Sequence, residues 1–102
     1  MYSTLSRFTL VFSELIKAGI PIAEALDTAI AMIDNLVLKT KFLSIRVAVE
    51  KGSALYKGMQ DTNLFENMII QMVSAGEDSG TLDSMISKVA DYYKMKFDEI
   101  ID

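Results

Sequence analysis

The chain has 102 residues, of which 51% are hydrophobic, so it is long enough for one domain with a buried core and hardly long enough for two. Its net charge of −4 argues against a nucleic-acid-binding domain, because such domains usually carry a basic excess that neutralises phosphates. With no cysteine and no histidine, it lacks disulfides, thiolate zinc sites, cysteine nucleophiles and the commonest general base, which predicts a non-enzymatic domain over residues 1–102 that uses no cofactor.

Amphipathic helices follow one another from the N-terminus, with apolar residues at the helical period of about 3.6. The first ends at Gly19, a residue type that commonly follows a helix in the left-handed conformation. The second begins at Pro21, which is favoured at a first helical position because its missing N–H would be unpaired there. Asp34-Asn35 can cap a third helix ending at Gly52, and Ser53 can cap a short fourth. The predicted buried residues of these helices are Leu5, Phe8, Phe12, Leu15, Ile16, Ile22, Ala25, Leu26, Ala29, Ile30, Ile33, Leu38, Phe42, Ile45, Val49, Leu55 and Met59.

A polar turn at residues 61–63 separates the fourth helix from the fifth. Asn63 and Glu66 have the spacing of a capping box, in which two side chains satisfy each other's backbone N–H groups. The fifth helix ends at Gly76, and a tight polar turn containing Gly80 leads into a long last helix. The predicted buried residues of these two helices are Phe65, Met68, Ile69, Met72, Val73, Leu82, Met85, Ile86, Val89, Tyr93, Phe97 and Ile100.

Six helical segments and no convincing strand pattern predict an all-α fold, a six-helix bundle of near-antiparallel amphipathic helices. The connections are short, so helices that follow one another should be neighbours in space. Gly19, Pro21, Gly52, Gly76 and Gly80 are the predicted structural turn residues, with Gly76 and Gly80 shaping the backbone between the last two helices.

Acidic residues occur in three places, one of which is Asp83 in the first turn of the last helix, where a carboxylate is favoured by the helix dipole. Glu77 and Asp78 lie between the last two helices, where a carboxylate favours the positive end of the following helix. Asp98, Glu99 and Asp102 lie at the C-terminal end of the last helix. Carboxylates can also bind calcium, but no loop with defined ligand spacing is present. The structural interpretation is favoured, and no metal is predicted.

The last helix also provides the candidate partner-binding residues. Tyr92 follows directly before Tyr93, so both rings cannot point into one core, and Tyr92 is a candidate for a partner contact. Asp98, Glu99 and Asp102 complete the candidate surface.

Neither a targeting segment nor a membrane span is recognisable. The residues after Met1 lack the basic and apolar regions of a signal peptide. The longest apolar runs fall well below the roughly 18 residues of a spanning helix. We expect this stretch of chain to be soluble.

Three segments resemble the type II secretion system F domain: residues 15–26 (LIKAGIPIAEAL), 49–55 (VEKGSAL) and 68–82 (MIIQMVSAGEDSGTL). The third is the most specific, because a Gly-Glu pair, a Ser-Gly pair and a following leucine recur there in the family pattern. Two departures are visible. Glu66 follows Phe65 where the family often has proline, and an alanine separates the Gly-Ser pair of the second segment from its leucine.

The resemblance implies an inner-membrane platform protein at the base of a machine that assembles type IV pili or type II secretion pseudopili. Such proteins carry related cytoplasmic helix bundles and membrane helices, and are thought to couple a cytoplasmic assembly ATPase to pilin or pseudopilin insertion. For this chain it implies a bundle at the cytoplasmic face of the bacterial inner membrane. The implied partners are the ATPase, other inner-membrane assembly proteins, pilin or pseudopilin, further copies of the chain, and the membrane through the rest of the full-length protein.

The residues by themselves leave an alternative open. A helical adaptor or regulatory domain of an unrelated family, binding a peptide or a partner helix, would show the same periodicity and the same lack of reactive groups.

Overall fold

The computed structural model describes the backbone of residues 1–101 and the side chains of residues 1–99. Across this part of the chain there are six α-helices and no strand, which confirms the predicted all-α fold. The helices are α1 (Tyr2–Lys17), α2 (Ile22–Ile30), α3 (Leu36–Glu50), α4 (Leu55–Asp61), α5 (Asn67–Ser79) and α6 (Leu82–Ile101).

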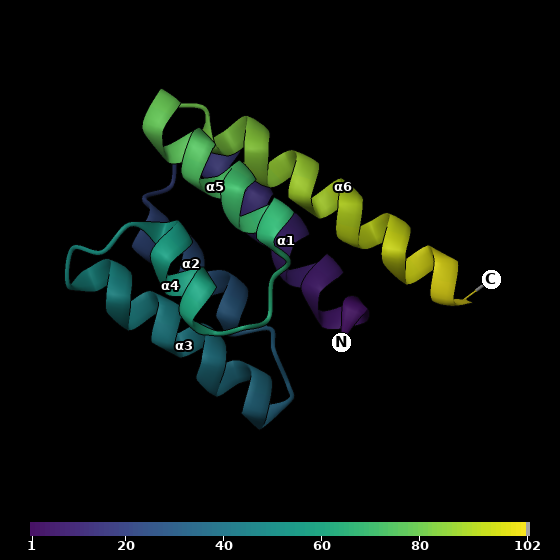
Figure 1. Ribbon diagram of the computed structural model, residues 1–102. Helices are drawn as coiled ribbons and strands as arrows, with labels where there is room; N and C mark the ends of the chain where they lie inside the picture. The colour runs from purple at the N-terminus through teal and green to yellow at the C-terminus, as the bar shows by residue number, and fades with distance from the viewer. Residues whose placement is uncertain (102) are drawn as a thin grey trace.

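The helices form a closed ring of neighbours. Each helix packs on the next one along the chain, and the most extensive packing joins α1 to α6, the first helix to the last. Figure 1 shows α5 and α6 side by side and running in opposite directions, with the two chain ends on the same side of the molecule. The final turns of α6 extend past the other helices. The sequence predicted the sequential neighbours, and the structure adds the contact that closes the ring.

A row of aromatic rings runs through the core. The ring of Phe8 on α1 lies 4.3 Å from that of Phe42 on α3, and Phe42 meets Phe65 edge-on at 5.9 Å. Phe65 meets Tyr93 of α6 at 6.4 Å, and Tyr93 lies 6.2 Å from Tyr2. Ring pairs at these separations add to the stabilisation from burial alone. The row therefore ties α1, α3 and α6 to the connection before α5.

Most of the predicted buried residues lie in this core or pack against it. Met85 and Phe97 of α6 are half-buried and lie outside it, and the largest departures are on α5. Met68 is 48% exposed, whereas Ile70, which the periodicity did not select, is buried. The prediction began the helix at Asn63 and counted Phe65 within it. The helix begins at Asn67, and its inner face is set by Ile69, Ile70, Val73 and Gly76. The predicted inward position of Ile100 lies outside the described side chains.

The glycine ends of α1 and α3 follow the prediction, whereas α5 continues past the predicted end at Gly76 and is closed by Gly80, and the proline is one residue off. Gly19, Gly52 and Gly80 have positive φ angles of 84°, 96° and 74°, so each occupies the left-handed conformation that glycine favours. Pro21 is the N-cap of α2 and not its first helical residue, and its carbonyl accepts a hydrogen bond from the Ala25 amide at 2.9 Å.

The predicted side-chain caps are correct at one helix and wrong at two. The Asn35 side chain accepts a hydrogen bond from the Leu38 amide at 3.0 Å and caps α3 as predicted. Asn63 instead adopts a left-handed turn conformation, with φ of 58°, and α5 has no side-chain cap. The Ser53 hydroxyl donates to the Ala54 carbonyl, so it does not cap α4.

We expect Tyr93→Phe to raise the stability of the chain. Tyr93 is 1% exposed, and its hydroxyl has no hydrogen-bond partner among the described residues. Burial, together with the Glu66 charge, raises the pKa of Tyr93, because the ionised hydroxyl would lack solvation. Removing an unsatisfied buried hydroxyl while keeping the ring should stabilise the fold by roughly 1 kcal/mol. Urea unfolding measures this, and a loss of stability would show that the hydroxyl makes a hydrogen bond in solution.

Candidate functional site

The segment with the most specific resemblance, residues 68–82, covers most of α5 and ends at the corner between α5 and α6. Gly80 ends α5 in the left-handed conformation, and the Thr81 amide donates to the Gly76 carbonyl at 2.9 Å. This is the six-to-one hydrogen bond of a Schellman helix end. The Ser79 and Thr81 hydroxyls lie 2.7 Å apart and share a hydrogen bond across the turn. The corner is thus held by its own backbone and hydroxyl groups.

Gly76 does not shape this turn, which corrects the prediction made for it. It lies buried within α5, with a right-handed helical backbone. A Cβ atom added at Gly76 would lie 2.9 Å from Cγ of Met85 and 3.1 Å from Cα of Leu82. Glycine is therefore needed because α6 approaches the α5 backbone at this point, and not because of a special φ angle.

Glu77 acts on a different helix from the one that the sequence suggested. Its two carboxylate oxygens accept hydrogen bonds from the Leu55 and Tyr56 amides, both at 2.8 Å. These amides begin α4, whose own N-cap residue, Ala54, has no capping side chain. The carboxylate therefore lies at the positive end of α4, where it satisfies two N–H groups that have no partner within the helix. Of the Gly-Glu pair, Gly76 thus lets α6 pack closely on α5, and Glu77 joins the start of α4 to α5.

Tyr92 has a defined position at the edge of the core. Its ring lies 5.3 Å from that of Tyr93, and its hydroxyl donates to the Glu66 carboxylate at 2.5 Å. This hydrogen bond, with partial burial and the Glu66 charge, raises the pKa of Tyr92 to about 12. The Lys96 ammonium lies 5.6 Å from the ring centre. The ring is half-buried, so part of it is open to a partner, and the sequence prediction of a contact there stays a prediction.

The candidate carboxylates occupy the exposed end of α6. Asp98 pairs with Lys94 at 3.3 Å and Glu99 with Lys96 at 3.8 Å, each within one helical turn. Exposed pairs of this kind contribute little to stability, so both carboxylates can exchange their lysine for a partner's cation. Asp102 lies outside the described residues. Within the described part of the chain, no three acidic side chains gather closely enough to hold a metal ion.

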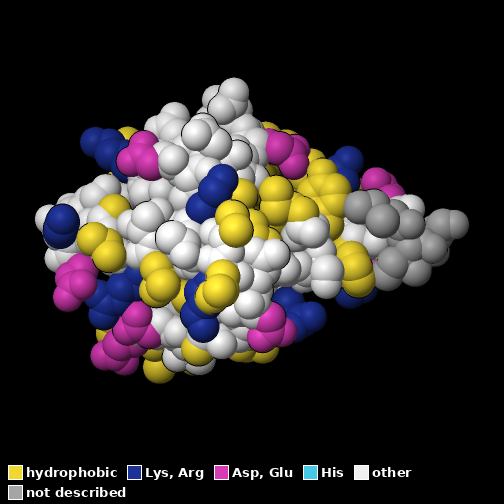
Figure 2. All heavy atoms as spheres, turned by 90° about the horizontal axis from the view of Figure 1, so that it is seen from below, with side chains coloured by type: hydrophobic (Ala, Val, Ile, Leu, Met, Phe, Trp, Pro, Cys, Tyr) yellow, Lys and Arg dark blue, Asp and Glu magenta, His cyan; other side chains and the backbone are white. Residues whose placement is uncertain are grey.

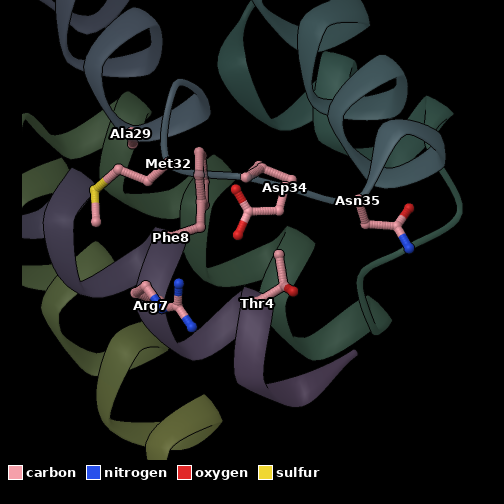
Figure 3. Close-up of a pocket in the computed structure, with 8 residues that line it drawn as sticks. Thr4, Arg7, Phe8, Ala29, Met32, Asp34 and Asn35 are labelled. Atoms are coloured by element: carbon pink, nitrogen blue, oxygen red, sulfur yellow. The ribbon is translucent and has the colours of Figure 1, made fainter.

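A small hollow of about 180 Å³ lies between the start of α1 and the connection from α2 to α3. Figure 3 shows Thr4, Arg7 and Phe8 on α1 and Met32 and Asp34 on the connection, while Asn35 points away toward α3. The volume is below the roughly 300 Å³ at which small-molecule pockets begin, and suits a single inserted side chain. The sequence does not predict this hollow, because its two walls are far apart in the chain.

The outer face of α3 is a second feature that was not predicted from the sequence. Leu36, Leu43 and Val47 are all exposed, although each is a large apolar residue. The signal was present, since these residues share the helical period with one another and lie opposite the buried stripe of the same helix. One apolar stripe is predicted for this helix, whereas it has two.

Comparison with known proteins adds a family match over nearly the whole chain. The family model described as type II secretion system (T2SS), protein F, matches residues 8–101. The type IV pilus assembly protein PilC of Pseudomonas aeruginosa is 39% identical over 100 residues, which are 98% of this chain and 27% of that protein. The type IV pilus assembly protein TapC of Aeromonas hydrophila is 37% identical over 98% of this chain and 24% of its own length.

Secretion proteins are matched as well as pilus proteins. The type II secretion system protein F of Vibrio cholerae is 30% identical over 95% of this chain and 24% of its own length. This chain thus spans about a quarter of the length of the curated relatives it matches. In the described part of the chain, no helix combines the length and the apolar character needed to cross a membrane.

Proposed function

This chain belongs to the type II secretion system protein F family, and we propose on that basis that it is a non-enzymatic docking module of a pilus or secretion assembly platform. Family membership removes the alternative of an unrelated helical adaptor. The proposed role is to bind the assembly ATPase and other components of the machine, and to pass movement between them.

One observation carries this proposal: the residues that give the chain its family resemblance are engaged inside the bundle. Gly76 permits the approach of α6, Glu77 caps α4, and Gly80 completes the corner. Groups held in this way are not free to react with a substrate. They fix the relative positions of three helices, so a displacement applied to one helix is passed to the others through close packing.

The proposed partners follow from the family and from the surface of α6. They are a cytoplasmic assembly ATPase, other inner-membrane assembly proteins, pilin or pseudopilin, and a second copy of the chain, all at the cytoplasmic face of the inner membrane. The single contacts should be weak, because tethering of the full-length protein in a membrane raises the effective concentration of each partner.

We expect changes at the end of α6 to impair filament assembly in the native host. The two variants of the full-length protein are Tyr92→Ala and the double charge reversal of Asp98 and Glu99 to lysine. Both positions are half-buried or exposed, so the bundle should still fold while the docking surface changes. Filaments are counted by electron microscopy, protein levels by immunoblotting, and folding by circular dichroism of the 102-residue chain.

Tyr92→Phe is the matched control. It keeps the ring but removes the hydrogen bond to Glu66, so it separates loss of that internal contact from loss of the exposed ring face. Filament assembly should survive Tyr92→Phe and fall with Tyr92→Ala. Wild-type assembly by both α6 variants, at normal protein levels, would exclude this surface as the docking site.

A further inference from the structure

α4 is the shortest helix in the described part of the chain, and its stability depends on the rest of the bundle. It has seven residues, Leu55–Asp61, whereas helices shorter than about 12 residues are marginal in water on their own. Figure 1 shows α4 between α3 and α5, with an irregular connection on each side. The contacts that hold α4 against its neighbours therefore decide whether it can separate from them.

The connections on both sides of α4 contain a residue in the left-handed conformation. Gly52, before the helix, has a φ angle of 96°, and Asn63, after it, has a φ angle of 58°. Asparagine adopts this conformation more readily than most residues other than glycine. Hinges form at a few residues near the ends of an element that can absorb large backbone changes. Gly52 and Asn63 are therefore placed to act as two hinges around α4.

Few polar contacts join α4 to the other helices. The Leu55 and Tyr56 amides donate to the Glu77 carboxylate, and among the described residues these are its only hydrogen bonds to another helix. The hydrogen bonds of Thr62, at the other end of α4, stay within residues 59–64. No ion pair of the described residues involves α4, whereas an ion pair joins α2 to α3. One carboxylate thus provides all the side-chain hydrogen bonding between α4 and the other helices.

The apolar contacts of α4 are also limited. Leu55 and Met59 are its only buried apolar side chains. α4 packs on the inner side of α3, whose outer side faces the viewer in Figure 2. Gly58 faces Ala48 and Ile45 there, with no side chain of its own to interlock with α3. Separating α4 would expose two apolar side chains and break two hydrogen bonds, far less than unfolding of the whole bundle requires.

We propose that the α4 segment, residues 54–62, opens as one unit by turning at the connections that contain Gly52 and Asn63, while the other five helices stay packed. Opening requires the two amides at the start of α4 to leave the Glu77 carboxylate, so this carboxylate controls it. The inference goes beyond the proposed docking function, because the opening is a property of the bundle alone.

The α4 segment is connected to the corner between α5 and α6. Glu77 follows Gly76, where α6 lies against the α5 backbone, so a displacement of α6 changes the position of the carboxylate relative to α4. Leu55 and Met59 border the same internal space as Phe12, so their departure uncovers part of the core. A movement at the corner is thereby converted into exposure of apolar surface beside α3.

Native-state hydrogen exchange of the 102-residue chain tests the opening. The amides of Leu55, Tyr56 and Met59 should exchange at least about tenfold faster than the slowest amides of α3 and α6, with a weaker dependence on urea. Their protection factors should agree within about threefold, because one opening releases all three. A gradient of protection along α4 would indicate fraying from one end, and protection equal to that of α3 would make the two helices a single unit. Either result would overturn the proposal.

A disulfide between α3 and α4 tests the same opening without removing a contact. The chain has no cysteine, and a Cβ atom added at Gly58 would lie 3.4 Å from Ala48 Cβ, close to the separation that a disulfide spans. The double variant Ala48→Cys with Gly58→Cys should keep the fast exchange of α4 when reduced, which makes the reduced form the matched control. In the oxidised form the α4 amides should exchange as slowly as those of α3, because α4 can no longer open alone.

Thiol labelling provides a measurement that needs no disulfide. Met59 and Ile86 are both buried, on α4 and α6 respectively, so Met59→Cys and Ile86→Cys each place a single thiol out of reach of a reagent. Circular dichroism checks that both variants fold. The thiol of Met59→Cys should be labelled at least about tenfold faster than that of Ile86→Cys, because a buried thiol reacts when its cover opens. Equal labelling, or fast α4 exchange that persists in the oxidised double variant, would show that α4 does not open separately. No partner takes part in these measurements, so their outcome is independent of the filament test at α6.

Discussion

Replacing Gly76 with valine should destabilise the fold by about 3 kcal/mol or more. The new side chain would begin with a Cβ atom 2.9 Å from Met85 Cγ and 3.1 Å from Leu82 Cα, and the second of these is backbone. A long side chain such as methionine can move aside, but the α6 backbone can move only by separating α5 from α6. Urea unfolding of the variant and the wild type gives the difference in free energy.

Gly58 provides the matched control, because it is the other buried helical glycine among the described residues. A Cβ atom there would lie 3.4 Å from Ala48 Cβ and from two atoms of Ile45, close to ordinary van der Waals contact. Gly58→Ala should therefore be neutral or slightly stabilising, since alanine favours a helix over glycine by up to about 1 kcal/mol. Gly76→Ala should already be destabilising. Equal effects at the two positions would contradict the close approach of α6.

The helices themselves were predictable from the sequence because their cause is local. The apolar period that runs through Leu5, Phe8 and Phe12 is present in the chain before it folds, and so is the left-handed preference at Gly19 and Gly52. The packing of α1 against α6 has no local signal, because it joins the two ends of the chain. Periodicity shows which face of each helix is buried, but not which helix covers it.

The capping predictions that were wrong also relied on local signals, whereas the actual cap comes from a distant part of the chain. Ser53 and Asn63 have side chains of the kind that cap helices, and each lies shortly before a helix start. The local sequence therefore predicts them as N-caps. The group that caps α4 is Glu77, 22 residues away from Leu55 along the chain. The prediction that Gly76 ends the fifth helix was wrong for a similar reason. From the sequence alone, a glycine that allows another helix to approach cannot be distinguished from a glycine at a helix end.

The candidate site was partly predictable. The sequence placed Asp98 and Glu99 at the end of a long last helix, and the structure places both on its exposed surface. It also indicated that Tyr92 lies beside the core, but not that Glu66 accepts a hydrogen bond from it, because Glu66 belongs to the connection before α5. The outer stripe of α3 has the same helical period as the buried stripe, and periodicity alone does not show which of two stripes faces the core.

Replacing Glu77 with alanine should cost roughly 2–3 kcal/mol of stability. Both carboxylate oxygens accept backbone hydrogen bonds at 2.8 Å, and the loss of the side chain leaves the Leu55 and Tyr56 amides without a protein partner. Charge-assisted hydrogen bonds of this kind are stronger than neutral ones, and an unsatisfied amide that is partly buried is expensive. The effect should exceed that of an ordinary local cap, because the same group also joins α4 to α5.

Two further substitutions at Glu77 and one at Glu50 distinguish the loss of the helix cap from the loss of a negative charge. Glu77→Gln keeps one acceptor oxygen and should lose about half as much stability as alanine, whereas Glu77→Asp is too short to reach both amides and should resemble alanine. Glu50→Ala is the control, because it removes an acidic residue that is exposed and paired with Arg46, and its effect should be much smaller.

Hydrogen exchange supplies the local measurement. In Glu77→Ala the amides of Leu55 and Tyr56 should exchange faster by a larger factor than those of α3, because α4 loses its only side-chain cap among the described residues and frays from its first turn. Because α4 has seven residues, loss of its first turn should release Leu55 and Met59 from the core and loosen the corner at residues 76–82. If Glu77→Ala and Glu50→Ala are equally stable and these amides keep their protection, the carboxylate does not hold α4 in place.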